Sequence, residues 1–123
     1  MAKILIVDDE EPVRAMLRDM LEVHEHEVEE AVDGRDAIEC YRRGHFDMVI
    51  TDLVMPDMNG LDLIMALREE KKDVKILAIS GGGGIVGRFD YLPIAKLIGA
   101  ESILKKPFDL QQFSSSVAKI LDA

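Results

Sequence analysis

An apolar run near the start of the chain ends in three acids, Lys3-Ile-Leu-Ile-Val-Asp-Asp-Glu10. A short run rich in Ile and Val is typical of a buried strand. A second run of this kind, Met48-Val-Ile-Thr-Asp52, also ends in an aspartate. In an open α/β sheet, ligands bind just beyond the carboxyl ends of the strands. The sequence therefore predicts that Asp8, Asp9 and Asp52 meet in one crevice.

A group of three carboxylates indicates a metal site. Like charges gathered closely repel one another, and a divalent cation among them offsets that repulsion. Because every side-chain ligand would be an oxygen, we expect Mg²⁺, with Mn²⁺ as the other candidate. The alternative is that each acid only caps a loop, which is more plausible for a single acid than for this set.

Length and composition indicate one ordinary domain over residues 1–123. The chain is 48% hydrophobic, which is enough for a single core without disulfides. Its net charge of -9 argues against nucleic-acid binding, which needs clustered Lys and Arg. No stretch approaches the roughly 20 apolar residues of a membrane helix, and none has the layout of a signal peptide. We therefore expect a cytoplasmic protein, with its lone cysteine, Cys40, buried and unreactive.

Predicted strands alternate with predicted helices along the whole chain, which is typical of β-α-β units around a parallel sheet. The predicted strands are residues 3–7, 28–31, 48–51, 74–79 and 102–104. The predicted helices are residues 11–22, 35–43, a segment after Gly60, 90–98 and a segment after Asp109. With right-handed crossovers, these elements predict an α/β fold with three layers, a doubly wound, flavodoxin-like sheet of strand order 2-1-3-4-5.

The last helix is predicted from its cap and its apolar face. Asp109 suits the N-cap, and Gln112 stands at the capping-box position. Apolar residues recur at helical spacing, and we expect the face that they form to be part of the core. These residues are Leu110, Phe113, Val117, Ile120 and Leu121.

Two further polar residues, Ser80 and Lys106, stand at the ends of the fourth and fifth predicted strands. Both are expected to project toward the three acids. A hydroxyl and an ammonium suit a phosphoryl group, whose oxygens need hydrogen-bond donors and positive charge. Because an aspartate can carry a phosphoryl group as an acyl phosphate, the sequence favours transient phosphorylation of one aspartate.

The chain resembles a known family, the response-regulator receiver domains of two-component signalling. Four segments carry the resemblance, in order and at suitable separations, and they extend over essentially the whole chain. The segments are Ile4-Leu-Ile-Val-Asp-Asp-Glu10, Thr51-Asp-Leu-Val-Met-Pro-Asp-Met-Asn-Gly60, Ile79-Ser-Gly81 and Lys105-Lys-Pro-Phe108. Each segment alone is a weak signal, whereas the four together are a strong one.

The resemblance implies the role of each site residue. Asp52 would accept the phosphoryl group. Asp9, Asp52 and the backbone carbonyl of Val54 would bind Mg²⁺ directly, and Asp8 would help through water. Ser80 would be the hydroxyl that moves onto the phosphoryl oxygens.

The resemblance also implies which groups contact the phosphoryl oxygens. Lys106 would pair with them, and the backbone N–H of Gly81 would contact them. Lys106 is preferred to Lys105 because it directly precedes Pro107, which in the family follows the lysine. Neighbouring residues of a strand also point to opposite faces, so only one of the two lysines can enter the site.

The chain departs from the family at Ile103. Members of the family usually have an aromatic residue at this position, and its rotamer changes when the hydroxyl at the position of Ser80 moves. A ring flip is therefore impossible here. Signalling would instead use the loop after Ser80, where Gly81-Gly-Gly-Gly84 leaves the backbone nearly unrestrained. An insertion without a role is an equally good interpretation of this loop.

The function implied is that of a signalling switch. A sensor histidine kinase or a histidine phosphotransfer protein would phosphorylate Asp52, and the surface of the fourth helix, fifth strand and fifth helix would change. With no output domain after Ala123, we expect the output to be binding to a downstream protein or phosphate relay, by a monomer or a phosphorylation-dependent dimer. The domain would catalyse only its own phosphorylation and dephosphorylation.

Two other functions share parts of this pattern. A Mg²⁺-dependent phosphohydrolase would also use an aspartyl phosphate, and it is the main alternative. Such enzymes usually have Asp-x-Asp after the first strand and a cap insertion, whereas this chain has Asp8-Asp-Glu10 and no insertion of that size. A flavodoxin-like cofactor binder would need a hydroxyl-rich phosphate loop where these acids stand.

Overall fold

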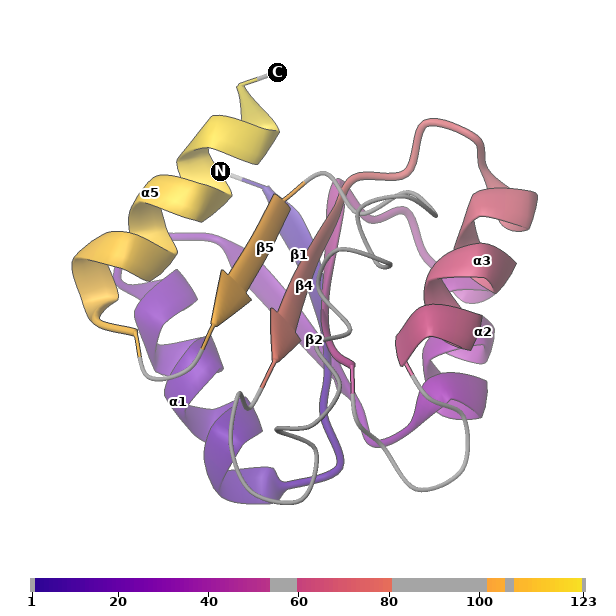
Figure 1. The fold of residues 1–123 in the computed structure, drawn as a ribbon, viewed down its shortest axis with the longest axis horizontal. Helices are drawn as coiled ribbons and strands as arrows, with labels where there is room; N and C mark the ends of the chain where they lie inside the picture. Colours follow the sequence, from indigo (N-terminus) through magenta and orange to yellow (C-terminus); the bar gives the residue numbers. More distant parts are fainter. Residues whose placement is uncertain (1, 54–59, 81–101, 106–107, 123) are drawn as a thin grey trace.

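A parallel sheet of five strands forms the centre of the protein, in the order β2-β1-β3-β4-β5 (Figure 1). The strands are β1 (Lys3–Val7), β2 (Glu27–Ala31), β3 (Met48–Asp52), β4 (Ile76–Ser80) and β5 (Ser102–Lys105). The helices are α1 (Glu11–Glu22), α2 (Gly34–Arg43), α3 (Gly60–Glu70) and α5 (Leu110–Leu121). The computed structural model describes residues 2–53, 60–80, 102–105 and 108–122, with only the backbone of Ser80 and Ile103. The predicted fold class and strand order are confirmed.

Helices cover both faces of the sheet, which gives three layers (Figure 1). Side chains of β1 alternate between the two faces, as a strand requires. Ile4 and Ile6 belong to the apolar cluster under α1 and α5, whereas Leu5 and Val7 belong to the cluster under α2 and α3. The predicted helix over 90–98 lies outside the described residues. None of the helices that are described has the length and apolar character needed to cross a membrane.

Most predicted boundaries lie within two residues of the observed ones. The fourth strand was expected to begin at Val74, but β4 begins at Ile76. The reason is local, because the Val74 N–H donates to the Lys71 carbonyl and so belongs to the turn after α3. Asp52 and Ser80 are the last residues of β3 and β4.

The predicted capping box of α5 is confirmed. The Gln112 N–H donates to Asp109 Oδ1 at 2.7 Å, and the Asp109 N–H donates to Gln112 Oε1 at 2.9 Å. The prediction was wrong for Leu110, which is 44% exposed, although the helix does bury Phe113. Helical side chains lean toward the helix N-terminus, so the first residue of α5 has no preceding turn to cover.

Cys40 of α2 is buried, as its apolar neighbours predict. Burial raises the pKa of the Cys40 thiol, with a further contribution from the nearby Asp36 carboxylate. A raised pKa keeps the sulfur protonated near neutral pH, so this cysteine acts as a small apolar side chain.

Gly60 begins α3 directly against the end of β3. Its N–H donates to the Leu53 carbonyl at 2.9 Å. A Cβ at this position would lie 2.5 Å from both the Asp52 carbonyl oxygen and Leu53 Cα. Because both are backbone atoms, a side chain here would push the segment that carries Asp52 out of place.

Gly60→Ala is therefore expected to lower the free energy of unfolding by about 1–3 kcal/mol, the usual cost of overpacking. Gly44→Ala is the matched control, since its Cβ would meet the Phe46 ring at 2.9 Å and a ring can shift. Urea unfolding of both variants measures the difference. Equal losses would contradict the assignment of backbone crowding to Gly60.

His26 accepts a partly buried hydrogen bond in the turn between α1 and β2. The Ala2 N–H donates to His26 Nδ1 at 3.1 Å. Burial lowers the pKa of His26, and the neighbouring His24 lowers it further. A protonated imidazole cannot accept a hydrogen bond, so the folded protein favours the neutral ring.

Stability is expected to fall as the pH falls through the folded pKa of His26. The folded state binds the proton less tightly than the unfolded chain, whose histidine titrates at about 6.5. The contribution of His26 is therefore present above that pH and is lost below it. Urea unfolding between about pH 8 and about pH 5 should show a weaker pH dependence for His26→Gln. A pH dependence of His26→Gln as steep as that of the wild type would contradict this assignment.

Candidate functional site

Asp8, Asp9 and Asp52 lie together at the carboxyl ends of β1 and β3. One carboxylate oxygen of each lies within 4.8 Å of those of the other two. Asp8 is buried, with 2% of its surface exposed, whereas Asp52 is half-buried and Asp9 is exposed. The structure thus brings together the three acids that the sequence places after two separate strands.

The register of the sheet explains this meeting. β1 and β3 are hydrogen-bonded neighbours in parallel, and Val7 is aligned with Thr51. The next residue of each chain segment is an aspartate, so Asp8 and Asp52 leave the sheet at the same edge. Asp9 follows Asp8 in the short turn before α1.

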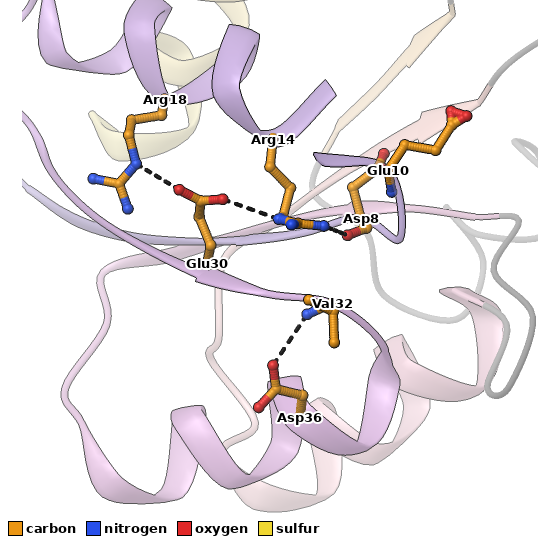
Figure 2. A network of polar contacts seen from close by, with 7 residues as sticks. All are labelled: Asp8, Glu10, Arg14, Arg18, Glu30, Val32 and Asp36. Carbon is orange, nitrogen blue, oxygen red and sulfur yellow. Dashed lines mark hydrogen bonds and ion pairs between the residues drawn. The ribbon is translucent and has the colours of Figure 1, made fainter. Parts of the chain in front are cut away.

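Asp8 is held at three points. Its N–H donates to the Ala31 carbonyl at 3.2 Å, and its Oδ1 accepts from the Glu10 N–H at 2.8 Å. Its carbonyl accepts from Arg14 Nη1 at 2.8 Å (Figure 2). These contacts anchor both the backbone and the side chain of the buried acid.

The backbone around Asp52 is also well fixed. The Thr51 hydroxyl donates to the Asp52 carbonyl at 2.9 Å, and the Leu53 N–H donates to the Ile79 carbonyl at 3.0 Å. Thr51 and Leu53 are both buried. Asp52 therefore presents its carboxylate from a rigid strand end rather than from a loop.

The other predicted site residues are placed only in part. Ser80 ends β4, and the register pairs it with Lys105 and pairs Asp52 with Ile79, so Ser80 reaches the same sheet edge. Lys105 is the last residue of β5 and is exposed. Val54, Gly81 and Lys106 lie outside the described residues, and their roles stay predictions.

The donor set suits a hard divalent cation. Three carboxylates supply only oxygen ligands, which favour Mg²⁺, Mn²⁺ or Ca²⁺ over softer metals. Two unit charges about 4 Å apart repel by about 4 kcal/mol at an effective dielectric constant of about 20. Because Asp8 is shielded from water, a cation bound among these acids would offset a repulsion that solvent screens poorly.

Arg14 contacts this region although no sequence motif marks it. Its partners are the Asp8 carbonyl and the Glu30 carboxylate, which belongs to β2. Both contacts depend on how α1 crosses the sheet. An amphipathic pattern alone shows only that Arg14 lies beside the apolar stripe of the helix.

The response regulator receiver domain family matches residues 4–118 of this chain. Response regulator MprA of Mycolicibacterium vanbaalenii is 33% identical over 119 residues, which are 97% of this chain and 50% of that protein. The NtrC transcriptional regulator of Azospirillum brasilense is 32% identical over 99% of this chain and 24% of its own length. The chain thus spans half or less of the length of these curated relatives.

Solved structures with this fold include a chemotaxis protein. CheY4 of Vibrio cholerae superposes with a TM-score of 0.85 at 31% identity, covering 98% of each chain. The family match over residues 4–118 agrees with what the structure shows. The sheet has the strand order β2-β1-β3-β4-β5, and the acid cluster lies at the carboxyl ends of its strands. This chain belongs to the response regulator receiver domains of two-component signalling.

Proposed function

We propose that this domain is a phosphoacceptor switch in which Asp52 takes a phosphoryl group from a phosphohistidine. The donor would be a sensor histidine kinase or a histidine phosphotransfer protein. The observation that carries the proposal is the acid cluster, in which carboxylate oxygens of Asp8, Asp9 and Asp52 lie within 4.8 Å of one another. Such a cluster is costly unless the protein uses it to bind a cation.

Asp52 is the best acceptor of the three acids. Asp8 is buried, and its Oδ1 already accepts a hydrogen bond from the Glu10 N–H. Asp9 is exposed in the turn before α1. Asp52 is half-buried at a fixed strand end, which leaves its carboxylate both reachable and well oriented. Orientation of this kind is the main requirement of phosphoryl transfer.

In the transfer step, a carboxylate oxygen of Asp52 forms a bond to phosphorus as the bond from phosphorus to the donor imidazole nitrogen breaks. The electron pair of the broken bond returns to that nitrogen. Asp9, Asp52 and the Val54 carbonyl would hold Mg²⁺ directly, with Asp8 helping through water, and the ion would supply positive charge that offsets the carboxylates and the phosphoryl oxygens. TrrA of Thermotoga maritima, whose solved structure is a complex with Mg(2+)-BeF, has a TM-score of 0.83 at 28% identity, covering 98% of this chain and 99% of that chain.

The remaining predicted residues would hold the phosphoryl group. Lys106 would supply a positive charge, Ser80 a hydroxyl, and Gly81 a backbone N–H. Ser80 supports this role by its position, since it ends the strand beside Asp52 in the sheet. The domain would act on no separate substrate and would catalyse only its own phosphorylation and dephosphorylation.

The output would be read on α5 and the elements next to it. The Phe108 ring stacks on the Phe113 ring of α5 with centroids 5.7 Å apart. This contact connects the segment after β5 to α5, so a change at the end of β5 can reach the helix. In the cytoplasm, a downstream protein or a second histidine in a phosphate relay would bind this surface, and the domain would act as a monomer or as a phosphorylation-dependent dimer.

Replacement of the acceptor tests the chemistry. After incubation with acetyl phosphate and Mg²⁺, the intact mass of the wild type should increase by one phosphoryl group. Asp52→Asn should show no increase, because an amide oxygen is a poor nucleophile. Asp19→Asn, at an exposed position of α1, should be phosphorylated like the wild type. Equal phosphorylation of Asp52→Asn would refute the assignment.

Charge removal at Asp9 tests the cation site. Without divalent cations, Asp9→Asn is expected to be more stable than the wild type by about 1 kcal/mol, since one repulsive charge is gone. With Mg²⁺ at one hundred times its dissociation constant, the wild type should gain about 2.7 kcal/mol. Asp9→Asn should lose most of this gain.

The control for this experiment is Glu10→Gln. It removes the same charge from the same turn but leaves the three clustered acids in place. Urea unfolding with and without Mg²⁺ measures all three proteins. Stabilisation by Mg²⁺ that is equal in the wild type and in Asp9→Asn would show that the cation binds elsewhere.

A further inference from the structure

Two arginines of α1 share one glutamate of β2 (Figure 2). Arg14 Nε lies 2.9 Å from Glu30 Oε1, and Arg18 Nε lies 2.6 Å from Glu30 Oε2. The hydrogen bond from Arg18, aided by that from Arg14, lowers the pKa of Glu30. The ionised carboxylate therefore joins the helix to the edge strand at both of its oxygens.

The two arginines differ in their second contact. Arg14 Nη1 donates to the Asp8 carbonyl at 2.8 Å, whereas Arg18 Nη1 donates to Glu22 of the same helix at 3.2 Å. The Arg14 side chain is 12% exposed and that of Arg18 is 32% exposed. Only Arg14 extends from the shared glutamate to the acid cluster.

Arg14 holds both ends of the turn that carries Asp8 and Asp9. Its side chain binds the Asp8 carbonyl, and its backbone N–H donates to the Glu10 carbonyl at 3.1 Å. The Arg14 side chain therefore helps to set the backbone of this turn, together with the bonds of Asp8 to Ala31 and Glu10. Asp52, by contrast, belongs to β3 and is held by the sheet.

We propose that Arg14 is a positioning residue that sets the place of the Asp8–Asp9 turn relative to Asp52 and thereby the cation affinity of the site. Glu30 fixes the plane of the guanidinium so that Nη1 meets the carbonyl. The inference rests on the proposed function, in which the acid cluster binds Mg²⁺. The inference adds that the spacing of the acids depends on a contact outside the cluster, the one between Arg14 and the Asp8 carbonyl.

Electrostatics alone predicts the opposite effect. Arg14 carries a positive charge near three carboxylates, so its removal should strengthen the binding of a cation. If Arg14 instead positions the turn, its removal should weaken binding, because a metal site tolerates ligand displacements of only about 0.2 Å. The direction of the change therefore separates the two explanations.

The test compares Arg14→Met with Arg18→Met. Each variant keeps the aliphatic stem and removes one ion pair with the same glutamate, so both should lose similar stability to urea. Mn²⁺ binding to the unphosphorylated proteins is measured by electron paramagnetic resonance, and Mg²⁺ binding by calorimetry. Arg14→Met is expected to bind both cations about tenfold more weakly, the effect typical of losing a group that orients a ligand. Arg18→Met should bind them as the wild type does.

Arg14→Lys keeps the charge but loses the fork that reaches two acceptors at once. It should therefore also bind Mn²⁺ more weakly than the wild type, and it decides the matter if Arg14→Met does not fold. In phosphorylation by acetyl phosphate, both Arg14 variants should need more Mg²⁺ for half the maximal rate. The rate at saturating Mg²⁺ should change much less.

Unchanged or tighter Mn²⁺ binding in the Arg14 variants would overturn the inference while leaving the proposed function intact. A wild type that binds neither Mn²⁺ nor Mg²⁺ would overturn the proposed function itself, and the positioning role with it. Equal weakening in Arg14→Met and Arg18→Met would assign the effect to the loss of the Glu30 ion pairs rather than to the Asp8 carbonyl.

Discussion

The parallel pairing of β1 with β3 is the constraint on which the site depends. Its register aligns Val7 with Thr51, so the residues that follow, Asp8 and Asp52, leave the sheet side by side. Because both strands are buried on both faces, a slip of one residue would exchange the apolar sets packed under the two helical layers. The core thus fixes the spacing of the acids.

The acid cluster lowers the stability of the fold, and the same feature suits the site to bind a cation. Three carboxylates held within 4.8 Å favour separation, and the buried Asp8 has little water to screen its charge. The apolar strands below the cluster and the hydrogen bonds of the Asp8–Asp9 turn oppose that tendency. A site that stores repulsion in this way is well suited to bind a cation, since binding releases the stored energy.

Local patterns predicted the parts of the fold that depend on neighbouring residues. Apolar runs gave the strands, and the Asp109 cap gave the start of α5. The prediction that Leu110 is part of the core was wrong, because helical periodicity takes no account of where a helix begins. The acids could be predicted to converge because parallel strands end at one edge of a sheet. The contacts of Arg14 could not be predicted. Its two acceptors, Glu30 and the Asp8 carbonyl, lie outside α1, and no local sequence pattern shows how α1 is placed relative to them.

The central strands and the edge strand β5 differ in their number of hydrogen-bonded neighbours, and this difference fits the proposed switch. Among the strands that the structure describes, β1 and β3 each have a hydrogen-bonded neighbour on both sides, whereas β5 pairs with β4 alone. Asp52 therefore stands on a central strand, and Asp8 and Asp9 directly follow another. In the proposed switch, the signal would be read through an element with two accessible arrangements, and an edge strand of four residues would meet that requirement better than a central one. Because Phe108 stacks on Phe113 just beyond β5, a shift of this edge strand would pass directly to the surface of α5.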